Sequence, residues 1–201
     1  MSEMFRDMTN LVNLNISSFD TRNVTSMSRM FNYLSKLATL DLSNFNTSKV
    51  TDMSDMFFGM SSLANLNISS FDTSNVTNMR EMFYSVSKLT SLDLSHFNTA
   101  KVTGSGMIAM FCGMNALKSL NVTSFDTSKI TNMYNMFYGT YSLTELDLSS
   151  FDTSSVESVS SMFQIYTSDM NKDKLEKIYV NNDFNVSKIT SYSSIFGGRK
   201  K

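Results

Sequence analysis

Residues that could carry out chemistry are few in this sequence. His96 is the only histidine and Cys112 is the only cysteine. Nucleophilic catalysis needs a base beside the nucleophile, and a structural zinc site needs about four nitrogen or sulfur ligands. His96 stands at a repeat position that is Ser or Asn elsewhere, and Cys112 lies in a linker. We therefore expect a protein that is not an enzyme, with no metal site and no cofactor.

The carboxylates recur at a regular spacing, which raises the question of calcium. Asp41, Asp93 and Asp147 occupy the same position in alternate repeats. At two steps of about 4.8 Å between neighbouring strands, they should lie about 9.6 Å apart. That is too far for shared coordination at about 2.3–2.6 Å. Asp126 and Asp152 form the one adjacent pair, so metal binding remains only as the least supported alternative.

A row of short polar side chains is the predicted binding surface. It follows exposed positions of a strand that recurs in each repeat, and it is rich in amide and hydroxyl groups, mildly acidic and nearly free of aromatic rings. Protein hot spots favour Trp, Tyr and Arg, so this surface favours hydrogen bonding to a glycan or an extended polar chain. The candidate ligand-binding residues are Asn15, Asp41, Asn67, Asp93, His96, Asn121 and Asp147.

The elements that position this row come from an internal repeat. The segment L-x-x-L-[DN]-[LIV] begins at six leucines and a degenerate copy begins at Leu175, at intervals of 26, 26, 26, 28, 26 and 32 residues. Of the 16 phenylalanines, 15 fall at two repeat positions. A second period of two repeats is also present, because Asn15, Asp41, Asn67 and Asp93 alternate Asn with Asp. Duplication of a two-repeat block explains this alternation, which also keeps like charges apart on neighbouring strands.

Each repeat contains two hydrophobic patterns. Leu66 and Ile68 alternate with polar residues, as in a short strand with one buried face. The residues Val76, Met79, Met82 and Phe83 then form one stripe of a predicted short helix. Thr73 precedes this stripe, where a hydroxyl can cap the helix. Neither element is stable alone, and stacking of repeats supplies the missing partners. The sequence thus predicts an α/β solenoid of leucine-rich-repeat type, with 26-residue strand–turn–short-helix units and a parallel sheet on one face.

The residues Leu-Thr-Ser-Leu-Asp-Leu-Ser at 89–95, followed by Phe97-Asn-Thr and Met110-Phe111, carry a specific resemblance. The chain resembles the BspA-like leucine-rich-repeat surface proteins of bacteria, also found in mycoplasma lipoproteins. The resemblance implies a cell-surface or secreted adhesion module, without catalytic residues. This chain departs from the family pattern in lacking a cysteine shortly after Met-Phe in most repeats.

The repeats define one domain over residues 1–201. Residues 1–10 form a partial repeat, and residues 11–174 form six repeats, the sixth with an insertion at 164–174. A smaller insertion lies at 104–106. Residues 175–196 are predicted as a degenerate C-terminal cap, and 197–201 as a solvated basic tail. The start of the chain lacks the features of a signal peptide, so we expect a fragment of a longer surface protein.

The amino-acid composition limits the classes of partner that we expect. The net charge is −1 and 17% of residues are charged, which gives no reason to expect nucleic acid. No apolar run approaches the length of a membrane span. We expect the protein to bind a host or neighbouring-cell surface protein or glycan. A structural spacer with no ligand is the alternative, and end-to-end self-association through the exposed end of the repeat stack is a further expectation.

Overall fold

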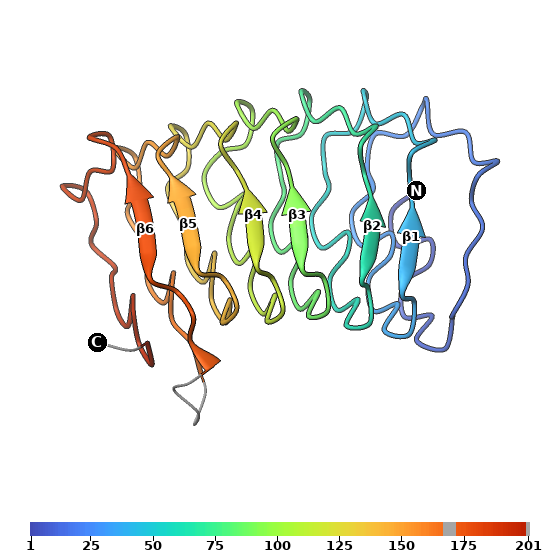
Figure 1. Ribbon diagram of the computed structural model, residues 1–201. Helices are drawn as coiled ribbons and strands as arrows, with labels where there is room; N and C mark the ends of the chain where they lie inside the picture. Colours follow the sequence, from blue (N-terminus) through green and yellow to red (C-terminus); the bar gives the residue numbers. More distant parts are fainter. Residues whose placement is uncertain (167–171, 200–201) are drawn as a thin grey trace.

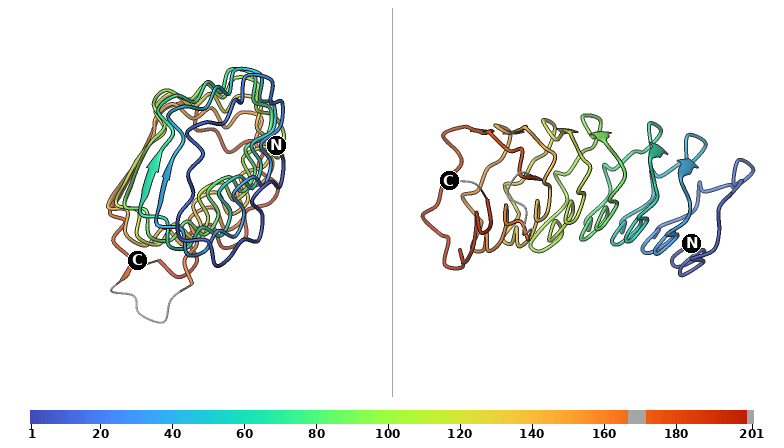
Figure 2. Two further views of the ribbon diagram at one scale, coloured as in Figure 1. Left: turned by 90° about the vertical axis from the view of Figure 1, so that its right-hand side faces the viewer. Right: turned by 60° about the horizontal axis from the view of Figure 1, so that its bottom comes forward.

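The computed structural model describes residues 1–166 and 172–199. The described chain winds in successive turns about one axis. Viewed along this axis, the repeats lie one behind the next (Figure 2, left). The strands of the described residues follow one another in chain order along one wall (Figure 1). They are β1 (Thr39–Asp41), β2 (Asn65–Asn67), β3 (Ser91–Asp93), β4 (Ser119–Asn121), β5 (Glu145–Leu148) and β6 (Lys177–Val180). This arrangement is compatible with the predicted repeat solenoid.

The strands pair in parallel, but two at a time. Strand β1 pairs with β2, β3 with β4 and β5 with β6, and no ladder joins these pairs within the described residues. The pairing follows the two-repeat period of the sequence. Asp41 stands opposite Asn67 and Asp93 stands opposite Asn121, so each of these pairs joins an Asp strand to the Asn strand that follows it.

The predicted short helix is replaced by turns. The Met82 N–H donates to the Met79 carbonyl (3.2 Å), whereas the Phe83 N–H donates to the Met110 carbonyl of the next repeat (3.0 Å). Glu81 has a φ of 55°, a left-handed conformation that a right-handed helix excludes. Because alternate N–H groups bond between repeats, the continuous i to i−4 ladder of a helix does not form. The predicted α/β class with short helices is therefore not confirmed, since the described residues form short strands, turns and irregular segments with almost no helix.

The residues of the expected helical stripe are nevertheless buried as predicted. Phe83 has no exposed surface, and its ring stacks on Phe57 (5.4 Å between centroids) and on Phe111 (6.0 Å). The same stacking continues from Phe111 to Phe137 at 5.5 Å. Methionines flank these rings and fill the space that the rigid rings leave. Each repeat therefore buries its apolar side chains against the repeats on either side.

Buried threonines join the repeats on the polar side of this core. The Thr73 hydroxyl donates to the Asn98 carbonyl (3.0 Å) and accepts the Asn98 N–H (2.7 Å). The hydroxyls of Thr21, Thr47 and Thr99 make the same two-bond bridge to the next repeat. The Thr127 hydroxyl donates to the Asp152 carbonyl (2.9 Å), and all four threonines are nearly inaccessible. Thr73 was expected to cap a helix in its own repeat, and it instead joins two repeats.

The C-terminal residues pack against the sixth repeat. Arg199, expected in a solvated tail, is buried. Its guanidinium donates to the Asp173 carboxylate (2.5 Å) and to the Phe163 carbonyl (2.6 Å). Asp173 belongs to the insertion at 164–174, of which residues 167–171 lie outside the described residues, as do 200–201. The ion pair thus joins the end of the chain to this insertion.

The smaller insertion at 104–106 lies in the turn segments and bonds to the preceding repeat. The Gly106 carbonyl accepts the Met79 N–H (2.8 Å), in the way that the Asn78 carbonyl accepts the Met53 N–H one repeat earlier. A Cβ at Gly106 would lie 2.7 Å from Val102, so glycine suits the tight turn that absorbs the extra residues. None of the described segments forms a helix of the length and apolar character that a membrane span requires.

Candidate functional site

The exposed wall of strands is the surface that the sequence predicted for binding. In β1 and β3 the central Leu is buried and the residues on either side of it are exposed. Three-residue strands of this kind turn only two side chains each to solvent, because successive side chains point to opposite faces. The face is therefore built from one pair of polar side chains per repeat.

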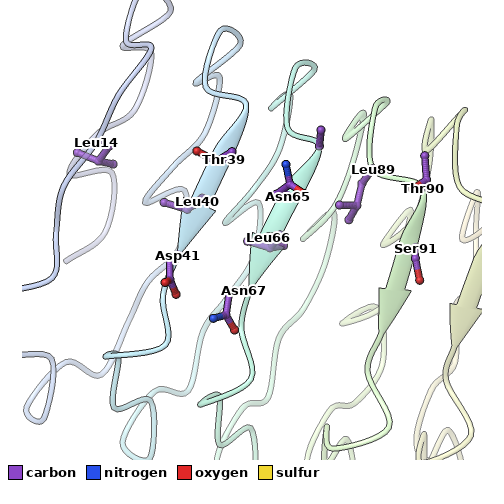
Figure 3. Close-up of a pocket in the computed structure, with 11 residues that line it drawn as sticks. Leu14, Thr39, Leu40, Asp41, Asn65, Leu66, Asn67, Leu89, Thr90 and Ser91 are labelled. Atoms are coloured by element: carbon purple, nitrogen blue, oxygen red, sulfur yellow. The ribbon is translucent and has the colours of Figure 1, made fainter.

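A pocket of about 530 Å³ lies on this wall at its N-terminal half (Figure 3). In Figure 3, Asp41 and Asn67 lie at the same end of neighbouring strands, and Thr39 and Asn65 lie at the other end. Leu14 extends the lining to the preceding repeat, and Leu89, Thr90 and Ser91 extend it to the following repeat. Leu40, Ala64 and Leu66 complete the lining. The floor is thus leucine, and the polar groups are hydroxyl, amide and carboxylate.

The predicted Asn and Asp residues also terminate the strands. The Asp41 Oδ1 accepts the Ser43 N–H (2.9 Å), and the Asn67 Oδ1 accepts the Ser69 N–H (3.2 Å) and hydroxyl (2.8 Å). Such bonds form a local turn, which explains why Asn or Asp occupies this position in the six regular repeats. The same turn is made by Asn15, Asp93, Asn121 and Asp147. One side-chain oxygen of each of these Asn and Asp residues therefore accepts a hydrogen bond within its own repeat.

These hydrogen bonds keep the carboxylates ionised. The pKa of Asp41 is lowered by the Ser43 N–H and hydroxyl and, to a smaller extent, by the Asn67 amide. The pKa of Asp93 is lowered in the same way by Ser95 and then by His96 and Asn121. The alternation of Asp with Asn thus places an amide beside each of these two carboxylates, where a second carboxylate would repel it. The face carries separated negative charges at neutral pH.

His96 is placed differently from the other candidates. Its Nε2 lies 3.2 Å from the Ile68 carbonyl of the preceding repeat, and its ring meets Phe97 edge-on (5.0 Å between centroids). Ser70 and Ser124 at the same repeat position donate to a carbonyl of the repeat before them. His96 therefore occupies a position that links repeats, and it does not line the pocket on the strand wall.

The C-terminal end of the wall is more highly charged than its centre. Glu145 on β5 accepts from the Lys177 ammonium (3.0 Å) and the Tyr179 hydroxyl (3.2 Å) on β6. This ion pair is exposed, so it stabilises the fold little. Among the candidates, Asp147 stands opposite Tyr179 in this sheet. The pocket brings together only Asp41 and Asn67, and the other candidates are spread along the wall.

Sequence reasoning underrated one set of pocket residues. Thr39, Asn65 and Ser91 line it as fully as Asp41 and Asn67 do. They sit two positions before the alternating Asn and Asp, on the same face of the strand. Strand periodicity predicts that they lie on the exposed face, but they vary between repeats and lack the regular alternation of Asn and Asp that marks the other position.

The groups considered for catalysis and metal binding are buried or hydrogen-bonded to neighbouring residues. Cys112 is buried, and burial raises the pKa of its thiol to about 12. The Asp126 and Asp152 side chains accept the N–H groups of Ser128 (3.0 Å) and Ser154 (2.8 Å). In residues 1–166 and 172–199, no three His, Cys, Asp or Glu side chains are grouped so that they could hold a metal ion.

Comparison with known proteins identifies the family. No match to a curated protein was found. A model of a family described as Mycoplasma protein of unknown function, DUF285, matches residues 1–118 and again residues 89–201. The two matches overlap and together span the chain, as expected for an array of similar repeats. The chain therefore belongs to the DUF285 family of Mycoplasma proteins of unknown function.

Proposed function

We propose that this protein is a non-enzymatic binding module of the cell surface, and that the strand wall binds an extended polar ligand such as a glycan. The observation that carries the proposal is the pocket across β1, β2 and the start of β3, with a leucine floor and polar walls. Binding sites commonly combine an apolar surface with a few convergent polar groups. The resemblance to BspA-like surface proteins supports an adhesion role and a host or neighbouring-cell partner.

The test uses lysine substitutions that do not disturb the strand-ending turns. Asn65→Lys and Ser91→Lys place two long charged side chains in the pocket and leave the side chains of Asp41 and Asn67 in place. The control is Ser74→Arg with Ser155→Lys, because Arg22 and Lys49 are native at these repeat positions. Both variants add two positive charges.

A glycan and extracellular-matrix array is then probed with the three proteins. We expect a ligand that the unmodified chain and the control bind and that the pocket variant does not. Equal binding by all three proteins would place recognition elsewhere on the surface. Melting temperatures of the variants exclude unfolding as the cause of a loss.

A structural spacer without a ligand is the second candidate. It is supported by the local hydrogen bonds of the strand-face residues, since Asp41, Asn67 and Asp93 all serve to end their own strands. A spacer needs such regular turns and no selective surface. Absence of any array ligand for a folded sample would favour this candidate over the binding module.

End-to-end association of this chain is proposed as well. The first repeat exposes Met4, Met8 and Val12, and the last exposes Tyr192 and Phe196. Contact between the first repeat of one copy and the last repeat of another would continue the stacking of the repeats. Such a head-to-tail contact leaves both outer ends of the assembly free, so further copies can add. Sedimentation of the 201-residue chain should show a mass that rises with concentration. A constant monomer mass at high concentration would disprove it.

A further inference from the structure

A second pocket, of about 580 Å³, lies beside the linkers that precede the later strands. Its lining comes from four successive repeats: Ser87, Lys88, Asn115, Ala116, Tyr141, Ser142, Lys172 and Lys174. Three of these residues are lysines, and none of the described lining residues is acidic. This pocket is distinct from the pocket across β1 and β2, because the two share none of their described lining residues.

The three lysines are available to a ligand. In the described part of the chain, the ammonium groups of Lys88, Lys172 and Lys174 form no ion pair or hydrogen bond. Other lysines of the repeats are occupied, as Lys36 donates to Asn10 (2.8 Å) and Lys101 donates to Asn75 (2.6 Å). Within residues 1–166 and 172–199, no acidic side chain therefore pairs with these three lysines.

The fold holds two of these lysines in place. Lys172 and Lys174 flank Asp173, which is buried and accepts from the Arg199 guanidinium (2.5 Å). The Lys174 N–H also donates to the Tyr141 carbonyl (2.9 Å). The insertion in the sixth repeat thus carries two lysines to the rim of the array, and the buried ion pair anchors the residue between them.

The neutral groups of the pocket offer mainly hydrogen-bond acceptors. The Ser87 hydroxyl donates to the Ser61 carbonyl (3.2 Å) and the Ser142 hydroxyl donates to the Asn115 carbonyl (2.7 Å). The Tyr141 hydroxyl donates to the Tyr166 carbonyl (3.2 Å). Because these hydrogens are used internally, the oxygens can accept hydrogen bonds from a ligand. The pocket therefore combines cationic donors with neutral acceptors.

We propose that this pocket binds an acidic polysaccharide, a sugar chain bearing carboxylate or sulfate groups. Ammonium groups bind the anionic groups, and the serine oxygens accept from sugar hydroxyls. The four repeats that line the pocket span about 14 Å, at about 4.8 Å from one repeat to the next. This length suits a chain with several anionic groups better than one small anion. Single-stranded nucleic acid is disfavoured, because it needs stacking rings and, among the described lining residues, Tyr141 alone is aromatic.

The test compares two triple variants of the full chain. The pocket variant is Lys88→Gln, Lys172→Gln and Lys174→Gln. The matched control is Lys36→Gln, Lys49→Gln and Lys101→Gln, which removes the same charge from exposed lysines elsewhere. Lys36 is the counterpart of Lys88 two repeats earlier. Binding of a heparin-derived hexasaccharide, of neutral maltohexaose and of a single-stranded oligonucleotide is measured by calorimetry at low and at physiological salt.

We expect the unmodified chain to bind the acidic hexasaccharide and not maltohexaose, with an affinity that falls as salt rises. The pocket variant should lose about tenfold in affinity, and the control should change less than about twofold. Absence of hexasaccharide binding, or an equal loss in both variants, would overturn the proposal. Tighter lysine-dependent binding of the oligonucleotide would overturn the assignment to a sugar. The strand wall carries none of these substitutions, so its function can fail or succeed independently.

Discussion

Replacing Thr73 by valine tests the hydrogen bonds that join neighbouring repeats. Valine has nearly the shape of threonine, so Thr73→Val replaces the hydroxyl by a methyl group and removes its hydrogen bonds. The Asn98 N–H then loses its acceptor (2.7 Å) and the Asn98 carbonyl loses a donor (3.0 Å). Thr73 is only 1% exposed, so water cannot readily replace the hydroxyl.

The expected cost follows from leaving a buried polar group without a partner. Such a group costs about 1–3 kcal/mol, which is a large fraction of a typical total stability of about 5–15 kcal/mol. Thr77→Val is the matched control. The Thr77 hydroxyl donates to the Thr51 carbonyl (3.1 Å), but the residue is exposed, so water can replace it. We expect the control to stay within about 0.5 kcal/mol of the unmodified chain.

Two measurements check this prediction. Urea unfolding compares the free energy of unfolding of both variants with that of the unmodified chain. Amide hydrogen exchange then localises the effect, because protection of the Asn98 N–H should fall in Thr73→Val and persist in Thr77→Val. Equal stability of the two variants, together with a protected Asn98 N–H, would refute the proposed inter-repeat role of the buried threonines.

Three further predictions concern the core, the carboxylates and the cysteine. In urea unfolding, Phe83→Ala should lower the free energy of unfolding by about 3–5 kcal/mol. Phe196 is 55% exposed, so Phe196→Ala should lower it by clearly less. Similar losses in the two variants would contradict the stacked core. Asp93 has a lowered pKa, so its stabilising contribution is present above its unfolded pKa of about 3.9 and is lost as pH falls through its folded pKa. The Asp93→Asn variant keeps the turn, since Asn67 makes the same turn. Its free energy of unfolding, measured by urea titrations, should therefore fall less between neutral and acid pH than that of the unmodified chain. The same pH profile in both proteins would argue against this. Cys112, with its pKa raised to about 12, should react with a thiol reagent only on unfolding, and rapid labelling of the folded chain would disprove its burial.

The repeat pattern was sufficient to predict the stacked array and its core. The periodic positions of Leu63, Leu66, Phe71, Val76 and Phe83 identified the side chains that lie inside, and all but the partly exposed Leu66 are buried. This works because hydrophobic burial depends on residue type and spacing, both of which are present in the sequence. The family match over both halves of the chain agrees with this reading of similar repeats.

The same spacing could not distinguish a helix from turns. Met79, Met82 and Phe83 would share one face of a helix, yet they also point inward from successive turns. The choice depends on partners in the next repeat, since the Phe83 N–H bonds to Met110 rather than along its own segment. Local propensity contains no information on such bonds between repeats.

The candidate site divides in a similar way. The sequence alone determined the exposed polar positions of the strands and the alternation of Asp41 with Asn67, because side-chain periodicity and repetition are local properties. Only the tertiary structure decided that strands pair two at a time, that Arg199 is buried against Asp173, and that lysines from separate repeats share a pocket. These features depend on how repeats and insertions meet in space, and residues far apart in the chain supply their partners.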